Sequence, residues 1–150
     1  IKYVHTNLIA KDAPTLIQFY KEVFNCKSFN STRDLKGDWV DALTNLKQAH
    51  ITGEHLVLPG YEEKFPTLKI FSYDENAEGL LPEINRPGFS HIAFEVDDVE
   101  SLVEKIIQHG GSLVGQIVKP IYPNKMQASL VYTKDPEGNI VELLNWKKLD

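Results

Sequence analysis

The chain has 150 residues, of which 42% are hydrophobic and 25% charged, proportions typical of one globular domain with a core of its own. Lys and Arg number 16 against 21 Asp and Glu, so the net charge of −5 argues against the phosphate backbone of a nucleic acid as the main partner. The single cysteine, Cys26, excludes an internal disulfide framework and a zinc site built from a cysteine cluster.

No apolar run approaches the roughly 20 residues that a membrane span needs, and no secretory signal is visible. We therefore expect a cytoplasmic protein whose partner is neither a membrane nor a nucleic acid.

The first half of the chain predicts a strand, a helix and then further strands. Residues 2–10 suit a strand, and Asp12 starts a helix with Pro14 in its first turn and apolar residues at helical spacing through Phe24. Leu35–Asp38 reads as a turn. The strand-like segments that follow the helix are about 27–34, 38–44, 48–58 and 66–73.

The second half predicts the same order after an irregular, proline-containing linker at about 75–87. Residues 89–96 suit a strand, Asp97 or Asp98 caps a helix, and Gly110–Gly111 ends that helix. The turn sequence DPEGN separates the last two strands. The strand-like segments are about 112–119, 126–134 and 139–146.

The two halves are an internal repeat. His5 precedes Asp12 by seven residues, and His91 precedes Asp98 by seven, so the internal shift is 86 residues. We predict a single domain of two repeated βαβββ modules, at about 1–74 and 88–148. The fold class is α+β, with the modules forming an open, curved cup of mixed sheet.

The repeat gives His5 and His91 equivalent places on the two first strands, on the less apolar face of each. Glu142 lies among apolar residues of the last strand, where a lone carboxylate is costly unless it is paired, protonated or metal-bound. Two imidazoles and one carboxylate can form a facial site for a divalent metal. Aligning Val141–Leu143 with Leu68–Ile70 makes Lys69 the repeat mate of Glu142, and a cation does not ligate a metal.

Lys69 has three interpretations. It could pair with Glu142 and replace the charge of a metal, bind an anionic substrate beside a metal with three protein ligands, or act as a base once desolvated. His50 and His55 lie five apart, so one regular strand would point them to opposite faces. The candidates for lining a substrate pocket are Trp39, His50, His55, Phe71, Tyr132 and Trp146.

Three segments carry a resemblance to a known family: HTNLIAKD with QFYKEVFNC, then RPGFSHIAFEVDDVE, then YTKDPEGNIVELLNW. The chain resembles the vicinal oxygen chelate superfamily, which includes glyoxalases, bleomycin resistance proteins and extradiol dioxygenases. The resemblance implies a divalent metal (Fe, Mn, Ni or Zn) held by His5, His91 and Glu142, and a homodimer. Lyases and epimerases of the family take a fourth ligand, Glu or Gln, from the strand that holds Lys69 here. Dioxygenases need only three, and the antibiotic-binding branch has no metal.

Two functions follow from these observations. The first is a metal-dependent enzyme of the lyase, isomerase or dioxygenase type, acting on a small oxygenated molecule through Glu142 and Lys69. The second is a metal-free binding protein, similar to bleomycin resistance proteins, in which Lys69 pairs with Glu142. The same fold hosts very different chemistry, so the family alone does not choose between them.

Overall fold

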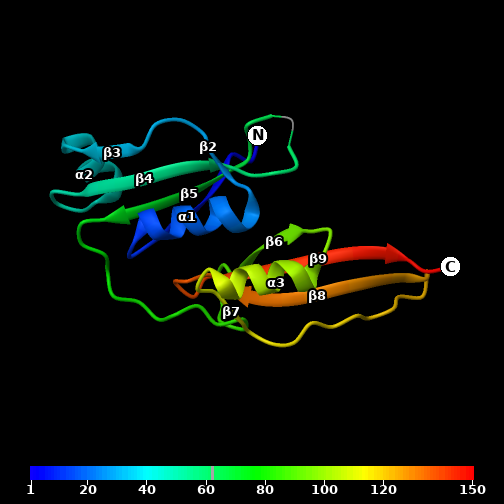
Figure 1. The fold of residues 1–150 in the computed structure, drawn as a ribbon. Coiled ribbons are helices and arrows are strands. Elements are labelled where there is room, and N and C mark those ends of the chain that lie inside the picture. Colours follow the sequence, from blue (N-terminus) through cyan, green and yellow to red (C-terminus); the bar gives the residue numbers. More distant parts are fainter. Residues whose placement is uncertain (62) are drawn as a thin grey trace. The chain divides into compact units, whose positions relative to one another are not determined.

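The computed structural model describes residues 1–61 and 63–150, and the chain divides into two units, Ile1–Gly79 and Leu80–Asp150. The boundary between them falls within the segment 75–87 that the sequence predicts as a linker. The described residues form three helices and nine strands in two mixed sheets, neither of which closes into a barrel (Figure 1). The predicted α+β fold class is confirmed.

The first unit builds its sheet around two central strands, β4 and β5. The strand order is β1-β5-β4-β2, and β3 also pairs with β4. β1 runs parallel to β5, whereas the other pairs are antiparallel. The elements of this unit are β1 (His5–Ile9), α1 (Ala13–Phe24), β2 (Lys27–Ser28), β3 (Arg33–Lys36), α2 (Asp38–Thr44), β4 (His50–Val57) and β5 (Thr67–Tyr73).

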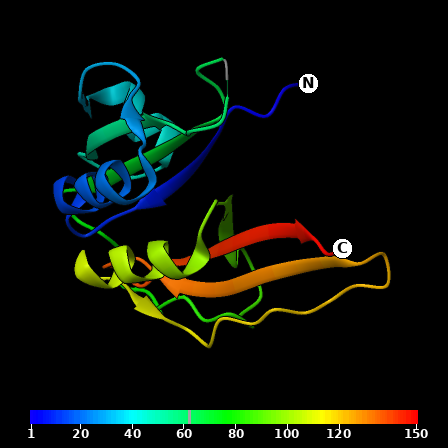
Figure 2. The same cartoon turned by 45° about the vertical axis from the view of Figure 1, so that its right-hand side comes forward.

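The helix α1 covers one face of this sheet, as Figure 2 shows. Its apolar stripe includes Leu16 and Tyr20, both fully buried. Lys21 of α1 pairs with Glu54 of β4 at 2.9 Å, and this contact identifies the side of β4 that faces the helix. Strand residues of opposite parity, such as His55, therefore lie on the other face.

The segment 38–44, predicted as a strand, is the helix α2, so this prediction is wrong. Gly37 precedes the helix with φ of 108°, a conformation that favours glycine, and Asp38 lies in the first turn, where an acid complements the helix dipole. The Asp41 carboxylate accepts hydrogen bonds from the backbone N–H groups of Gln48 and Ala49, both at 2.8 Å. These contacts hold α2 against the residues just before β4. They stabilise the helix although some residues of α2 favour strands.

The second unit repeats the arrangement with a four-stranded sheet of order β6-β9-β8-β7. β6 runs parallel to β9, and the other pairs are antiparallel. The helix α3 is capped by Asp98, whose side chain accepts from the N–H of Ser101 at 2.9 Å. The elements are β6 (His91–Glu95), α3 (Val99–Gln108), β7 (Ser112–Leu113), β8 (Met126–Lys134) and β9 (Ile140–Lys148).

The predicted strand 112–119 is regular only over β7, but the chain beyond it stays against β8. Val118 and Leu130 exchange two backbone hydrogen bonds of 2.9 Å, and Tyr122 N–H donates to Met126 O at 2.8 Å. Residues 114–122 therefore follow the edge of β8 without forming a regular strand.

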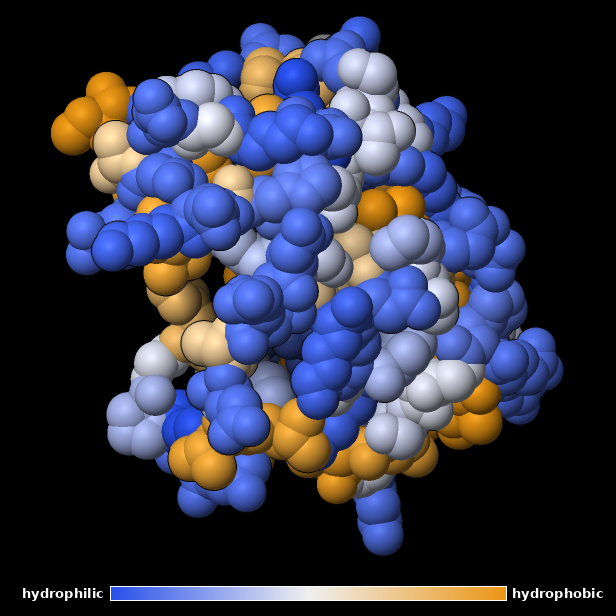
Figure 3. All heavy atoms as spheres, turned by 90° about the vertical axis from the view of Figure 1, so that its left-hand side faces the viewer, coloured by the Kyte–Doolittle hydropathy of each residue, from blue (hydrophilic) through white to orange (hydrophobic). Residues whose placement is uncertain are grey.

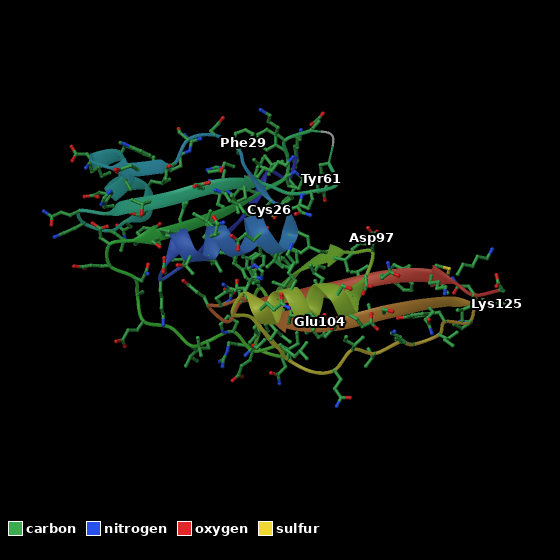
Figure 4. The ribbon with its side chains drawn as sticks, in the orientation of Figure 1. Cys26, Phe29, Tyr61, Asp97, Glu104 and Lys125 are labelled. Atoms are coloured by element: carbon green, nitrogen blue, oxygen red, sulfur yellow. The ribbon has the colours of Figure 1, made fainter. Side chains whose placement is uncertain are left out.

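The surface is mainly polar on the face drawn in Figure 3, where apolar side chains lie in small groups among hydrophilic ones. Within the described part of the chain, every helix is too short or too polar to span a membrane. Cys26 follows α1 (Figure 4) and is 3% exposed, and burial raises its pKa to about 12. A buried thiol with such a pKa is unreactive, so Cys26 belongs to the core.

Candidate functional site

Three adjacent strands of the first unit place His5, His55 and Lys69 on one face of the sheet. Lys69 of β5 lies directly opposite His55 of β4, and His5 of β1 lies opposite Thr67, two residues before Lys69. Residues that face each other across a ladder, and those two apart on a strand, share one face. We call this face, which is opposite to α1, the open face of the first unit.

The side chains of the open face approach one another closely. The rings of His5 and His55 are 6.3 Å apart, and His55 lies 5.6 Å from the ring of Phe71 in an edge arrangement. Lys69 Nζ stands 5.6 Å from the centre of the Phe71 ring, within the range of a cation–π contact. Two imidazoles, one amine and an aromatic ring therefore form a single cluster.

Burial and neighbouring cations set the protonation of this cluster. Burial, helped by the positive charges of Lys69 and Arg33 and by the nearby His5 ring, lowers the pKa of His55 to about 4. Burial and Lys69 also lower the pKa of His5, and burial and Arg33 lower that of Lys69. His5 and His55 are therefore neutral near pH 7, with ring lone pairs available to a proton or a metal.

One buried polar group of this unit has no partner. Thr67 is 1% exposed, and within the described residues its Oγ1 makes no hydrogen bond. Because Thr67 pairs with His5 in the ladder, the two side chains lie on the same face of the sheet, the open face.

The second unit brings His91, Tyr132 and Glu142 together on the corresponding face of its own sheet. His91 Nε2 lies 3.2 Å from Glu142 Oε2, and the ring of Tyr132 lies 5.1 Å from that of His91. Tyr132 of β8 is directly opposite Glu142 of β9. The side chains of His91 and Glu142 are 28% and 20% exposed, so solvent reaches both.

The ladder registers of the two units match. Lys69 lies opposite Asn7, two residues after His5, and Glu142 lies opposite Ala93, two residues after His91. Lys69 and Glu142 thus hold equivalent positions in their sheets, as the sequence repeat predicts. The same comparison makes Tyr132 the counterpart of His55, because each faces the equivalent residue from the neighbouring antiparallel strand.

The three residues predicted as metal ligands are divided between the two units. Considering either unit by itself, the residues that the structure describes include no group of three His, Cys, Asp or Glu side chains able to hold a metal ion. The first unit offers His5, and the second offers His91 with Glu142.

Two of the predicted pocket residues lie apart from the open face of the first unit. His50 is on the opposite face, where its ring nitrogens contact Asp74 at 2.9 Å and Asp34 at 2.8 Å. These contacts give it a structural role and raise its pKa. Trp39 is on α2 and is 57% exposed.

The other predicted pocket residues lie on the faces that carry the clusters. Phe71 is beneath Lys69, and Trp146 shares its face of the second sheet with Glu142 and contacts Tyr122, ring centres 5.3 Å apart.

Arg33 is a member of the cluster that the sequence analysis did not predict. It lies opposite Gly53 on β4 and so points to the open face, two residues along the strand from His55. The pairing of β3 with β4 would have placed Arg33 on this face. Predicting a strand at 38–44 made that pairing hard to recognise.

The family model described as the Glyoxalase/Bleomycin resistance protein/Dioxygenase superfamily matches residues 2–143. No curated protein sequence matches the chain.

Solved structures with similar folds cover almost the whole chain. A glyoxalase family protein from Bacillus cereus is 20% identical with a TM-score of 0.75, covering 97% of this chain and 93% of that one. The trypanothione-dependent glyoxalase I of Leishmania major is 21% identical with a TM-score of 0.62, covering 97% and 86%. A fosfomycin resistance protein from Listeria monocytogenes is 18% identical with a TM-score of 0.55, covering 97% and 91%. At these identities the likeness shows the fold alone.

A mutant of the Listeria protein has been solved with Mn(II) and 1S,2S-dihydroxypropylphosphonic acid, and its likeness to this chain is similar, at 17% identity and a TM-score of 0.55.

Proposed function

Because the chain belongs to the glyoxalase/bleomycin resistance protein/dioxygenase superfamily, we propose that it is a metal-dependent enzyme acting on a small oxygen-bearing molecule. Membership supports a role as a metalloenzyme or a ligand-binding protein. In this role, His5, His91 and Glu142 would be the ligands of a divalent metal. The reaction would be of the lyase, isomerase or dioxygenase type. The observation that carries it is the contact of His91 with Glu142, an imidazole nitrogen and a carboxylate oxygen 3.2 Å apart on adjacent strands.

The chemistry of the donor set fits a site with three protein ligands. A metal takes the lone pair of a neutral imidazole, and the lowered pKa of His5 keeps its ring neutral near pH 7. Two imidazoles and one carboxylate suit iron, manganese, nickel or zinc, and the Mn(II) complex of the Listeria protein is a precedent on this fold. A bound ion would supply a Lewis acid that polarises substrate oxygens.

Lys69 and Glu142 have different tasks in this proposal. Glu142 serves as a ligand, whereas Lys69 stays off the metal and contacts the substrate. The protonated amine of Lys69 attracts an anionic group, and burial and Arg33 lower the pKa of Lys69, which favours the neutral form that can accept a proton. The protein would work in the cytoplasm as a homodimer.

A metal-free binding protein is the second candidate, and one observation favours it. Lys69 occupies the ladder position equivalent to Glu142, so a positive charge stands where a second carboxylate ligand would otherwise lie. In this candidate Lys69 pairs with Glu142, and the sheet faces hold a ligand without a metal.

Elemental analysis of protein purified without chelator and without a metal-affinity tag tests the proposal. We expect about one equivalent of iron, manganese, nickel or zinc, and a melting temperature that falls when the metal is removed. Glu142→Gln should abolish stoichiometric binding. Glu104→Gln, which changes an exposed acid on α3 (Figure 4), is the matched control and should retain it.

If no metal binds even after soaking, and the chelated and soaked proteins melt at the same temperature, the metal-dependent function is wrong. The metal-free candidate would then stand.

A further inference from the structure

The strands of the first unit separate their charges between the two faces of the sheet. β1 to β5 contain two carboxylates, Asp34 and Glu54, and both lie on the side of α1. Each has a partner there, because Glu54 pairs with Lys21 and Asp34 contacts His50. The open face carries Lys69 and Arg33 instead, so its positive charge has no compensating carboxylate from these strands.

The positive charge of the open face is also partly removed from water. Lys69 is half-buried against the Phe71 ring, and among the described residues of the first unit no carboxylate forms an ion pair with Lys69 or Arg33. A partly desolvated cation without a counter-ion is costly, and a bound anion would offset that cost. Lys69 and Arg33 on the open face therefore favour the binding of an anionic ligand.

Gly53 lets β5 approach β4 closely beside these groups. It lies opposite Arg33 on one side and Phe71 on the other, in the middle of the ladder. Gly53 has φ of 148°, and a Cβ built on it would lie 2.0 Å from Ile70 O, so no side chain fits there. The backbone of β5 and the Phe71 ring fill the place that a side chain at Gly53 would take, and Arg33 of β3 lies directly opposite Gly53.

Aromatic rings line the same cluster. The ring of Phe29 lies 6.3 Å from that of His55, tilted by 31°, and 5.3 Å from that of Phe65. Phe71 meets His55 from the other strand. Phe71 itself is 6% exposed and packs with Val40 and Ile51, so a ligand held by its charge would place an apolar body against Phe29.

We propose that the open face of the first unit binds a small organic carboxylate, with its carboxylate at Lys69 and Arg33 and its apolar body against Phe29. The Thr67 hydroxyl, buried and without a partner, is a further donor at the base of the cluster. The inference rests on the proposed function and deepens it by naming the class of substrate that this site takes. An inorganic oxyanion would share the contacts to the cations but not the contact to Phe29.

Isothermal titration calorimetry of the full chain, treated with chelator near neutral pH, tests this inference. The probes are phenylacetate, its neutral match phenylacetamide, and inorganic phosphate. We expect phenylacetate to bind more tightly than either of the others. Lys69→Gln should weaken phenylacetate binding by about tenfold to a hundredfold, as expected for the loss of a charge-assisted contact.

Arg33→Gln is a second variant with the same expected direction, which keeps the test decisive if Lys69→Gln fails to fold. Lys47→Gln, an exposed lysine in the loop before β4, is the matched control and should bind like the wild type. Equal binding of phenylacetate and phenylacetamide, or equal loss in the Lys47 variant, would overturn the inference. Tighter binding of phosphate would overturn the carboxylate assignment.

The result is independent of metal content. Anion binding that depends on Lys69 in chelated protein supports the inference even if no metal is ever found. A loaded metal site without such binding refutes the inference alone.

Discussion

Replacing His55 by glutamine is expected to change how the stability of the protein depends on pH. In the folded protein the pKa of His55 is about 4, because the ring is partly buried and lies near the cations Lys69 and Arg33 and the His5 ring. In the unfolded chain the ring returns to its ordinary value of 6.5. The folded state therefore takes up the proton less readily, and the stabilisation from the neutral ring, complete above the unfolded pKa, is lost as the pH falls from 6.5 towards 4.

The size of the effect follows from the two pKa values. A difference of about 2.5 corresponds to about 3.4 kcal/mol, at about 1.36 kcal/mol for each pH unit. His55 is only partly buried, and solvent screens its interactions with the cations, so we expect about 1–2 kcal/mol of this value. The wild type should lose that much more stability than His55→Gln between neutral pH and pH 4.

Urea denaturation of both proteins across this pH range measures the difference, since the other acids and bases contribute to both and cancel. Titration of the His55 ring followed by NMR gives the folded pKa directly. Lys69→Gln should move that pKa back towards its ordinary value. Parallel stability curves for the wild type and His55→Gln would refute the assignment of His55 to a positively charged, partly desolvated cluster.

Three further predictions concern single side chains. Lys69→Glu should raise the affinity for zinc, nickel or manganese by adding a carboxylate at the position equivalent to Glu142; equal affinity in a metal titration would show that this position does not reach the metal. Asp41→Ala should lower the free energy of unfolding by about 1–2 kcal/mol, because two backbone N–H groups lose their acceptor; an unchanged urea midpoint would contradict this account of α2. His50, whose pKa is raised by Asp74 and Asp34, should stabilise the fold below the ordinary histidine pKa and lose this contribution as the pH rises through the folded value; a pH-independent difference between wild type and His50→Gln would argue against it.

The repeat made much of the fold predictable. Asp12 and Asp98 cap their helices as the sequence indicates, and the shift of 86 residues between His5 and His91 corresponds to equivalent strands in the two units. Capping and periodicity are local signals, so they survive without knowledge of the tertiary structure.

Features that depend on distant contacts were not predictable in the same way. The segment 38–44 carries Trp39 and Val40, which favour strands, and its helix depends on Asp41 contacts to residues beyond it. The equivalence of His55 and Tyr132 was hidden because they are 77 positions apart rather than 86, since the connections differ in length. The combination of His5 with His91 and Glu142 at one metal stays a prediction.

The segment 114–122 has a consequence for how the second unit behaves towards other chains. An uncovered edge strand offers a row of free N–H and C=O groups that can template intermolecular pairing. Backbone bonds from Val114, Val118 and Tyr122 occupy these groups along β8. Loosening this segment, for example by proteolytic cleavage within it, would uncover most of the edge of β8, leaving only the end paired with β7 protected, and that free edge could start aggregation.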